Sequence, residues 1–205
     1  MNPQWAAPPA ADPCLFQLYS SRSNQKGGTF IDGTVVDLAS HRRKLLTPDE
    51  YRPEACRCGC DCLHVHGLRE RHPRQCVVDG LPVPVIDILV FICSACGGTW
   101  RVLPGFLARC LWRPWNVVER ETLAMPRAPG APPVPVRTVQ RWRARLAQAA
   151  RLPIQVLVVA GGKLRALAER AGLEATRAQF VQACGLSFAG VAVLLHRLAP
   201  GVRLM

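Results

Sequence analysis

Six of the ten cysteines in this chain fall into two short clusters, and their spacing constrains the fold more than any other feature. The first cluster spans residues 56–62 and has a cysteine at every second position. The second is the pair Cys93 and Cys96. A structural zinc ion takes four thiolate or imidazole ligands, commonly as two pairs on two tight turns. The pattern therefore predicts one structural zinc ion per chain, joining two turns of a small β domain.

The second cluster has the spacing of a zinc knuckle. In a C-x-x-C turn the two thiolates close on one ion while amide groups of the turn donate hydrogen bonds to the sulfurs. Gly97 and Gly98 follow Cys96 and can adopt the positive φ that such a turn needs. Cys93 and Cys96 are therefore two of the expected ligands.

The first cluster leaves the other two ligands open, because none of its pairs has C-x-x-C spacing. Cys56 is the preferred first ligand, since Pro53 fixes the chain just before it. Cys58 precedes a glycine, as knuckle cysteines often do, whereas Cys60 offers a longer reach. The candidate ligands are Cys56, Cys58, Cys60, Cys93 and Cys96, and the alternatives for one of the first pair are Cys62, His64 and His66.

The positive charge of the chain lies mainly in its second half. Its 26 basic and 14 acidic side chains give a net charge of +12, and 23 of the basic residues are arginine. Residues 113–151 carry eight basic and two acidic side chains, and residues 152–205 carry six and two. Arginine is suited to bidentate contacts with phosphate and guanine, so this clustering favours a nucleic-acid partner. A GC-rich genome would explain the preference for arginine over lysine but not the clustering.

The pattern of chain breakers and hydrophobic residues divides the sequence into four regions. Residues 1–50 read as an N-terminal arm with a β-hairpin around Asp32-Gly33, and residues 51–112 as a zinc ribbon of β-strands. Residues 113–151 form a basic helical region, and residues 152–205 hold C-terminal helices. Three helices are expected in the last region, at 162–172, 175–185 and 189–199.

A basic amphipathic helix is predicted within VRTVQRWRARLAQAA, residues 136–150. Val139, Trp142 and Leu146 recur at helical spacing and form its apolar face. The remaining positions offer polar and basic side chains for contact with DNA, namely Arg137, Thr138, Gln140, Arg141, Arg143 and Arg145. The competing interpretation is a solvated basic helix on an ordinary helical bundle.

Several motifs in the middle of the chain are shared with a known group of proteins. They are Tyr51-Arg52-Pro53, the cysteine cluster, His66-Gly67 followed by Arg69 and Arg71, FICSACGGTW at 91–100, and Val102-Leu103-Pro104. Over about residues 51–112 the chain resembles the N-terminal zinc ribbon of bacterial insertion-sequence transposases. It resembles more closely a family of short zinc-ribbon proteins encoded beside such elements. The first knuckle departs from the family's C-x-x-C spacing.

The resemblance implies a helix-turn-helix after the ribbon, with residues 136–150 as the recognition helix in the major groove. The expected fold class is therefore α+β, a small β zinc ribbon followed by an all-α helix-turn-helix region. The N-terminus has no signal-peptide pattern, and no window approaches the roughly 18 apolar residues that span a bilayer. We expect no membrane association and a cytoplasmic, nucleoid-associated bacterial protein.

An enzymatic role is not expected. A DDE transposase needs two or three carboxylates on an RNase H-like sheet to hold two Mg²⁺ ions. Asp87 is the last aspartate, and only four glutamates follow it in the remaining 118 residues. The only tyrosines, Tyr19 and Tyr51, lie upstream of the basic half, so tyrosine-dependent strand cleavage is not expected either.

The sequence thus predicts a zinc-stabilised, non-catalytic DNA-binding protein that acts as an accessory or regulator of a mobile element. Its expected partners are double-stranded DNA and a separate transposase or integrase subunit, and a homodimer stays open. The alternative is a zinc-ribbon module for protein interaction or dimerisation that does not bind DNA specifically. Salt-dependent binding to duplex DNA separates these two hypotheses.

Overall fold

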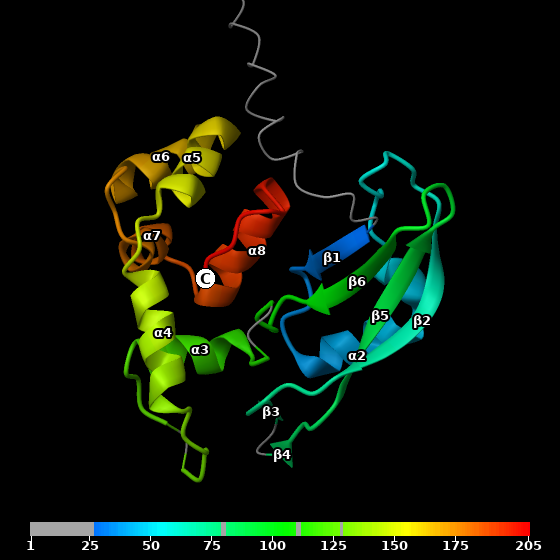
Figure 1. The fold of residues 1–205 in the computed structure, drawn as a ribbon, viewed down its shortest axis with the longest axis horizontal. Helices are drawn as coiled ribbons and strands as arrows, with labels where there is room; N and C mark the ends of the chain where they lie inside the picture. The colour runs from blue at the N-terminus through cyan, green and yellow to red at the C-terminus, as the bar shows by residue number, and fades with distance from the viewer. Residues whose placement is uncertain (1–26, 79–80, 110–111, 128) are drawn as a thin grey trace, which may run out of the picture.

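The computed structural model describes residues 27–78, 81–109, 112–127 and 129–205. Strands occupy its N-terminal half and most helices its C-terminal half, which confirms the predicted α+β class (Figure 1). The N-terminal half contains β1 (Gly27–Asp32), α2 (Leu38–Leu46), the 3-10 helix η1 (Pro48–Tyr51), β2 (Leu63–Arg71), β3 (Val77–Val78), β4 (Leu81–Pro82), β5 (Ile86–Cys93) and β6 (Thr99–Pro104). The C-terminal half contains α3 (Trp115–Thr122), α4 (Val136–Leu146), α5 (Arg151–Ala160), α6 (Gly162–Ala171), α7 (Arg177–Cys184) and α8 (Phe188–Leu198).

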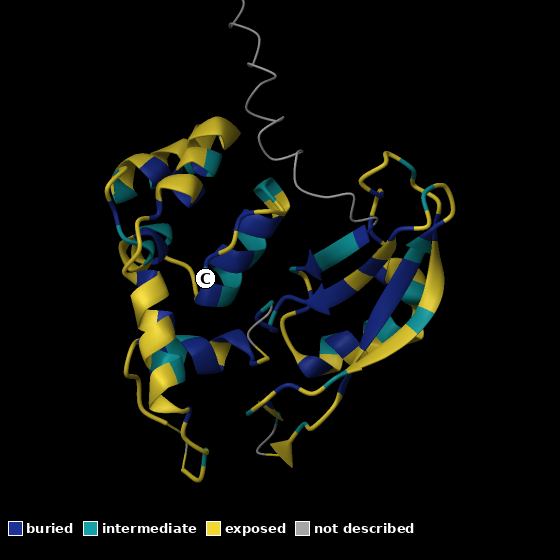
Figure 2. Ribbon diagram, viewed as in Figure 1, coloured by how far each residue is buried: buried dark blue, intermediate teal, exposed yellow. Residues whose placement is uncertain are grey.

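Four strands form one mixed sheet in the order β1-β6-β5-β2. β5 is antiparallel to both of its neighbours, and its nearly continuous apolar run is buried on both faces (Figure 2). On one face Leu89 and Phe91 pack with Val35 and with Tyr51 from η1. β3 and β4 form a separate two-stranded ribbon.

The hairpin predicted around Asp32-Gly33 is wrong. β1 pairs in parallel with β6, from Gly27 beside Thr99 to Asp32 beside Pro104, and the chain then turns into α2. Asp32 holds this turn, because its Oδ1 accepts hydrogen bonds from the Thr34 amide at 2.9 Å and the Thr34 hydroxyl at 2.7 Å. A local hairpin rule does not detect a parallel partner so distant in the sequence.

The predicted N-terminal arm of residues 1–50 therefore does not stand apart from the sheet. Residues 1–26 lie outside the described residues, and the rest of the arm supplies the edge strand β1, α2 and η1. α2 was not anticipated. It begins with a capping box in which Asp37 and Ser40 satisfy each other's backbone amides.

The helices of the C-terminal half share one hydrophobic core that includes Trp142, Leu146, Phe180 and Leu195. The three helices predicted at 162–172, 175–185 and 189–199 are confirmed as α6, α7 and α8. Gly172 and Gly185 end α6 and α7 with positive φ angles. α5 was not anticipated; Pro153 lies in its first turn, where proline is compatible with a helix.

The α-helices of the described residues are 8 to 11 residues long. None of them alone is long and apolar enough to cross a bilayer. Only α7 and α8 taken together reach the required length and composition, and they meet at a bend of 94°.

Candidate functional site

Four cysteine thiols from the two sequence clusters converge at one end of the sheet. The Sγ atoms of Cys56, Cys58, Cys93 and Cys96 all lie within 4.8 Å of one another. The Cys56–Cys96 and Cys58–Cys93 sulfur pairs are each 3.6 Å apart. Tetrahedral zinc with Zn–S bonds of about 2.3 Å would place its sulfurs about 3.8 Å apart. The four cysteines thus form a possible metal site of the right size.

Two tight turns, each ending in a glycine, hold the four thiols. In the second turn the Gly97 amide donates to the Cys93 carbonyl at 2.9 Å, and Gly97 has a φ of 69°. In the first turn the Gly59 amide donates to the Cys56 carbonyl at 2.9 Å, and Gly59 has a φ of 85°. Residues with side chains rarely adopt this conformation, so each pair requires a glycine after its second cysteine. Cys58-Gly59 is therefore the counterpart of Cys96-Gly97.

The surroundings favour the thiolate, the form that binds metal ions, at two of the four cysteines, Cys56 and Cys93. Cys58 and Cys96 also accept a backbone hydrogen bond, but burial and the neighbouring thiols outweigh it and raise the pKa of both. The backbone amide of Cys96 donates to Cys93 and lowers the pKa of that thiol to about 6. Burial alone would raise the pKa of Cys56, but hydrogen bonds from the Cys58 amide and the Trp100 indole outweigh it and lower the pKa. The Trp100 Nε1 donates to Cys56 Sγ at 3.3 Å. These donors orient the sulfurs as second-shell groups do in metal sites.

Cys60 is not among the four converging thiols, although the sequence made it a candidate ligand. Its backbone carbonyl accepts a hydrogen bond from the Cys56 amide at 2.7 Å, so it shapes the first turn instead. Its side chain lies with Asp61 and Cys62 in a separate, largely exposed group. The glycine after Cys58 was one sequence signal in favour of Cys58, but the sequence left the choice between Cys58 and Cys60 open.

His64 and His66, the proposed replacements for a thiolate, are exposed on β2. Neither belongs to the group of four thiols or to the Cys60 group. The structure thus brings together four candidate ligands, and all four are cysteines.

Helix α4 presents a stripe of arginines to solvent. Arg137, Arg141 and Arg145 are spaced at i, i+4 and i+8 and are exposed, as is Gln140. Figure 2 shows much of α4 as exposed. The opposite side buries Trp142 and Leu146, as the periodicity predicted. No carboxylate in the described part of the chain forms an ion pair with any of the three arginines.

The other two residues predicted to contact DNA have different surroundings. The Arg143 guanidinium donates to the carbonyls of Thr122 at 3.2 Å and Glu121 at 3.1 Å. It therefore satisfies carbonyls at the C-terminal end of α3, where positive charge is stabilising. Thr138 is only half-exposed. Four of the six predicted residues remain on the outer face of α4.

The connection between α3 and α4 is longer than the turn of a helix-turn-helix. Thirteen residues separate Thr122 from Val136, whereas the DNA-binding motif uses a turn of about three or four residues. Buried Glu121 anchors this connection through ion pairs to Arg120 at 3.1 Å and Arg127 at 2.7 Å. The predicted short-turn motif is therefore not formed by α3 and α4, although the two helices pack together.

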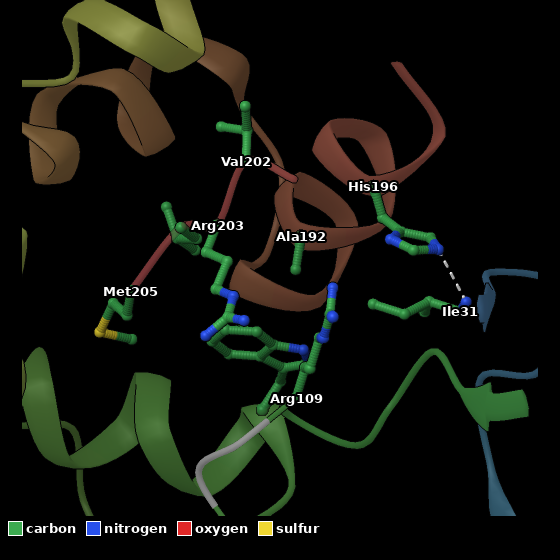
Figure 3. Close-up of a pocket in the computed structure, with 9 residues that line it drawn as sticks. Ile31, Arg109, Ala192, His196, Val202, Arg203 and Met205 are labelled. Carbon is green, nitrogen blue, oxygen red and sulfur yellow. Dashed lines mark hydrogen bonds between the residues drawn. The ribbon is translucent and has the colours of Figure 1, made fainter. Parts of the chain in front are cut away.

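A small cavity lies where the sheet meets α8 (Figure 3). Its volume of about 30 Å³ is no more than one water molecule occupies. In its wall His196 Nε2 accepts a hydrogen bond from the Ile31 amide at 2.9 Å. Burial, with a contribution from Arg109, lowers the pKa of His196 to about 4, so the ring is neutral near pH 7. This contact joins the two halves of the chain, and nothing in the sequence indicated it.

Comparison with known proteins gives no family to set beside this geometry. No protein-family model, curated protein or solved structure matches the chain.

Proposed function

We propose that this chain is a zinc-stabilised DNA-binding protein. A zinc ion held by Cys56, Cys58, Cys93 and Cys96 would fix the sheet as a zinc ribbon, and the outer face of α4 would contact duplex DNA. The observation that carries the DNA-binding part is the stripe of three arginines on α4, which have no acidic partner among the residues that the structure describes.

The metal proposal rests on the number and chemistry of the ligands. Four thiolates fill all positions of a tetrahedral ion, which is typical of structural rather than catalytic zinc. The donor hydrogen bonds to Cys56 and Cys93 support such a site, because they stabilise negative charge on sulfur before a metal binds. Zinc would supply folding free energy to the sheet by linking β5 to the loop before β2.

The DNA proposal rests on charge and on the shape of α4. α4 has 11 residues. An α-helix with its side chains is about 10 to 12 Å in diameter, which matches the roughly 12 Å width of the major groove. Arginines on its outer face could contact phosphates or the edges of guanines. Because the apolar face packs in the core, the arginines would meet DNA on a rigid support.

The proposed role is non-catalytic and accessory to a mobile element. The link to mobile elements rests on the resemblance of residues 51–112 to transposase zinc ribbons. Three of the four glutamates after Asp87 pair with arginines, which does not favour a role in holding catalytic metal ions. Glu121 is neutralised by two arginines, Glu169 pairs with Arg165, and Glu174 pairs with Arg151. A separate transposase or integrase would then supply the chemistry.

Duplex binding measured against salt concentration tests the proposal. We expect the zinc-loaded protein to bind a blunt DNA duplex, with affinity falling steeply as salt rises. The triple substitution Arg137→Gln, Arg141→Gln and Arg145→Gln should weaken binding and reduce the log–log salt slope by about 2 to 3. As a charge-matched control, Arg151→Gln, Arg165→Gln and Arg170→Gln removes three exposed arginines of α5 and α6. Equal losses in both triple variants, or no binding by the native chain, would refute the proposal.

An interaction module is the second candidate, and one observation favours it. The outer side of α5 exposes apolar residues, with Val159 74% exposed and Val158 41% exposed. Such side chains can form a contact between helices of two chains. Sedimentation of the native chain and of Val159→Asp would show whether this surface forms a dimer.

A further inference from the structure

Trp112 is held at the protein surface, unlike the other tryptophans that the structure describes. Its side chain is 57% exposed, whereas Trp100, Trp115 and Trp142 are buried. Its backbone has a φ of 56°, a conformation that costs a residue with a side chain about 1 to 3 kcal/mol. A large aromatic ring in solvent on a strained backbone contributes little to folding, so its placement requires another explanation.

One arginine packs on this ring, and a second contacts the Trp112 backbone. The Arg74 amide donates to the Trp112 carbonyl at 2.7 Å and so holds the strained backbone in place. The Arg71 guanidinium lies 5.8 Å from the ring centroid and also donates to the Ala108 carbonyl at 2.8 Å. Trp112 is therefore an aromatic surface with fixed orientation beside positive charge.

The surroundings of Trp112 carry further positive charge. Arg113 follows it and is buried, and both burial and the nearby charge of Arg74 lower the pKa of Arg113. Arg74 itself is exposed. Among the described residues, neither Arg74 nor Arg113 forms an ion pair with a carboxylate. Glu121 acts in the opposite direction on the pKa of Arg113, so exposed Arg74 is the cation here that would attract an anionic ligand.

We propose that Trp112, together with Arg71 and Arg74, binds an unpaired nucleobase of single-stranded DNA. Every base has a flat π-face that stacks on an exposed aromatic ring, and each such stack contributes about 1 to 3 kcal/mol. The guanidinium groups would neutralise the phosphates that flank the stacked base. Neither the zinc site nor the arginines of α4 account for this group of residues.

This binding surface is connected to α4. Arg113 lies with its guanidinium 5.4 Å from the ring centroid of Trp142, on the buried face of α4. The Arg113 Nε also donates to Gln75 Oε1 at 3.0 Å, and Gln75 Nε2 donates to the Pro132 carbonyl at 2.5 Å, shortly before α4 begins. The inference rests on the proposed DNA-binding function and adds a single-stranded ligand, held at Trp112, to the duplex proposed for the outer face of α4.

Fluorescence anisotropy with three labelled DNAs tests this site in the full, zinc-loaded chain. The probes are a short oligo-dT, a blunt duplex, and the same duplex with an oligo-dT overhang. Trp112→Ala should weaken oligo-dT binding by about 5- to 100-fold, which corresponds to the loss of one stacked base. It should also abolish any preference for the overhang while leaving blunt-duplex binding unchanged. Trp112→Phe should retain most of the oligo-dT affinity, because it keeps an aromatic face.

Two further variants separate this site from α4 and from effects on folding. The triple substitution of Arg137, Arg141 and Arg145 to Gln should weaken blunt-duplex binding and spare oligo-dT binding. Arg74→Gln should weaken oligo-dT binding and lower its salt dependence without changing the circular dichroism spectrum.

The possible outcomes distinguish the two proposals. Trp112 would have no role in base binding if folded Trp112→Ala bound oligo-dT like the native chain, or if the native chain did not bind oligo-dT at low salt. A loss in Trp112→Phe equal to that in Trp112→Ala would also exclude stacking. If oligo-dT binding depends on Trp112 while duplex binding is absent, the Trp112 site stands and the α4 proposal fails.

Discussion

The two halves of the molecule place their candidate functional groups in different ways. In the sheet half, four sulfurs from two distant segments lie within 4.8 Å of one another and depend on two glycine turns. In the helical half, the arginines of α4 are spaced by helical periodicity alone and face solvent. A site assembled from distant segments is lost with the tertiary fold, whereas a stripe on one helix can be altered without unfolding. The following predictions test that difference, beginning with the largest effect.

Removing two of the four candidate zinc ligands should unfold the sheet half first. Cys93→Ser with Cys96→Ser leaves two thiolates, too few to hold a structural zinc ion, and zinc binding supplies folding free energy to such domains. We expect loss of bound zinc, loss of strand signal in circular dichroism, and helix signal that persists from α3 to α8. Metal analysis and thermal melts measure these effects.

The cysteines of the exposed group provide the matched control. Cys60→Ser with Cys62→Ser removes the same number of thiols from the neighbouring loop, outside the four converging sulfurs. We expect one zinc ion per chain and a native melting temperature. Zinc loss in this variant but not in Cys93→Ser with Cys96→Ser would contradict the assignment of the ligands.

A core substitution in the helical half should have the next largest effect. Trp142→Ala removes a buried ring that packs against Arg113 and anchors α4 in the core, and such truncations cost about 3 to 5 kcal/mol. Chemical denaturation should show this loss while the zinc content stays at the native value. The exposed neighbour Arg141→Ala is the control and should change stability by less than about 0.5 kcal/mol. Zinc loss in Trp142→Ala would show that the two halves fold as one unit.

The sequence predicts those parts of the fold that depend on short-range patterns. The apolar face of Trp142 and Leu146, the glycine stops at Gly172 and Gly185, and the strand of residues 86–93 follow from periodicity and local sterics. The parallel pairing of β1 with β6 does not follow from such patterns. It depends on a contact between segments about seventy residues apart, and Asp32-Gly33 has the local signature of a hairpin.

The same limit applies to the candidate sites. The knuckle spacing identifies Cys93 and Cys96, but the choice between Cys58 and Cys60 depends on the path of the first turn, where the Cys56 amide bonds to the Cys60 carbonyl. The spacing of charges on α4 does not reveal that Arg143 donates to the end of α3. These assignments require tertiary structure because they depend on which backbone groups lack a partner.

The contact between the two halves should weaken in acid. His196 has a pKa of about 4 in the folded chain, below the usual value of 6.5, so the unfolded chain takes up a proton first as the pH falls. The stabilisation by neutral His196 is complete above about pH 6.5. As the pH falls toward 4, the free energy of unfolding should decrease by about 2 kcal/mol at most, because solvent screens part of the effect. Urea unfolding as a function of pH measures it.

His196→Gln is the control for this prediction. Glutamine retains an acceptor for the Ile31 amide but does not titrate, so its stability should depend less on pH over this range. Zinc held at the proposed site would be released in acid from both proteins alike, so the difference between their pH profiles isolates the histidine. Identical profiles would mean that protonation of His196 does not affect the free energy of unfolding.

The smallest expected effect comes from alanine in the positive-φ turns. Gly97 in the second knuckle and Gly130 between α3 and α4 have φ angles of 69° and 77°, and nothing would contact an added Cβ at either position. Gly97→Ala and Gly130→Ala should therefore each cost about 1 kcal/mol of backbone strain. Only Gly97→Ala should also weaken zinc binding, because its turn carries Cys93 and Cys96. Competition with a chromogenic chelator measures zinc affinity, and equal affinities in the two variants would show that the thiols do not depend on the turn.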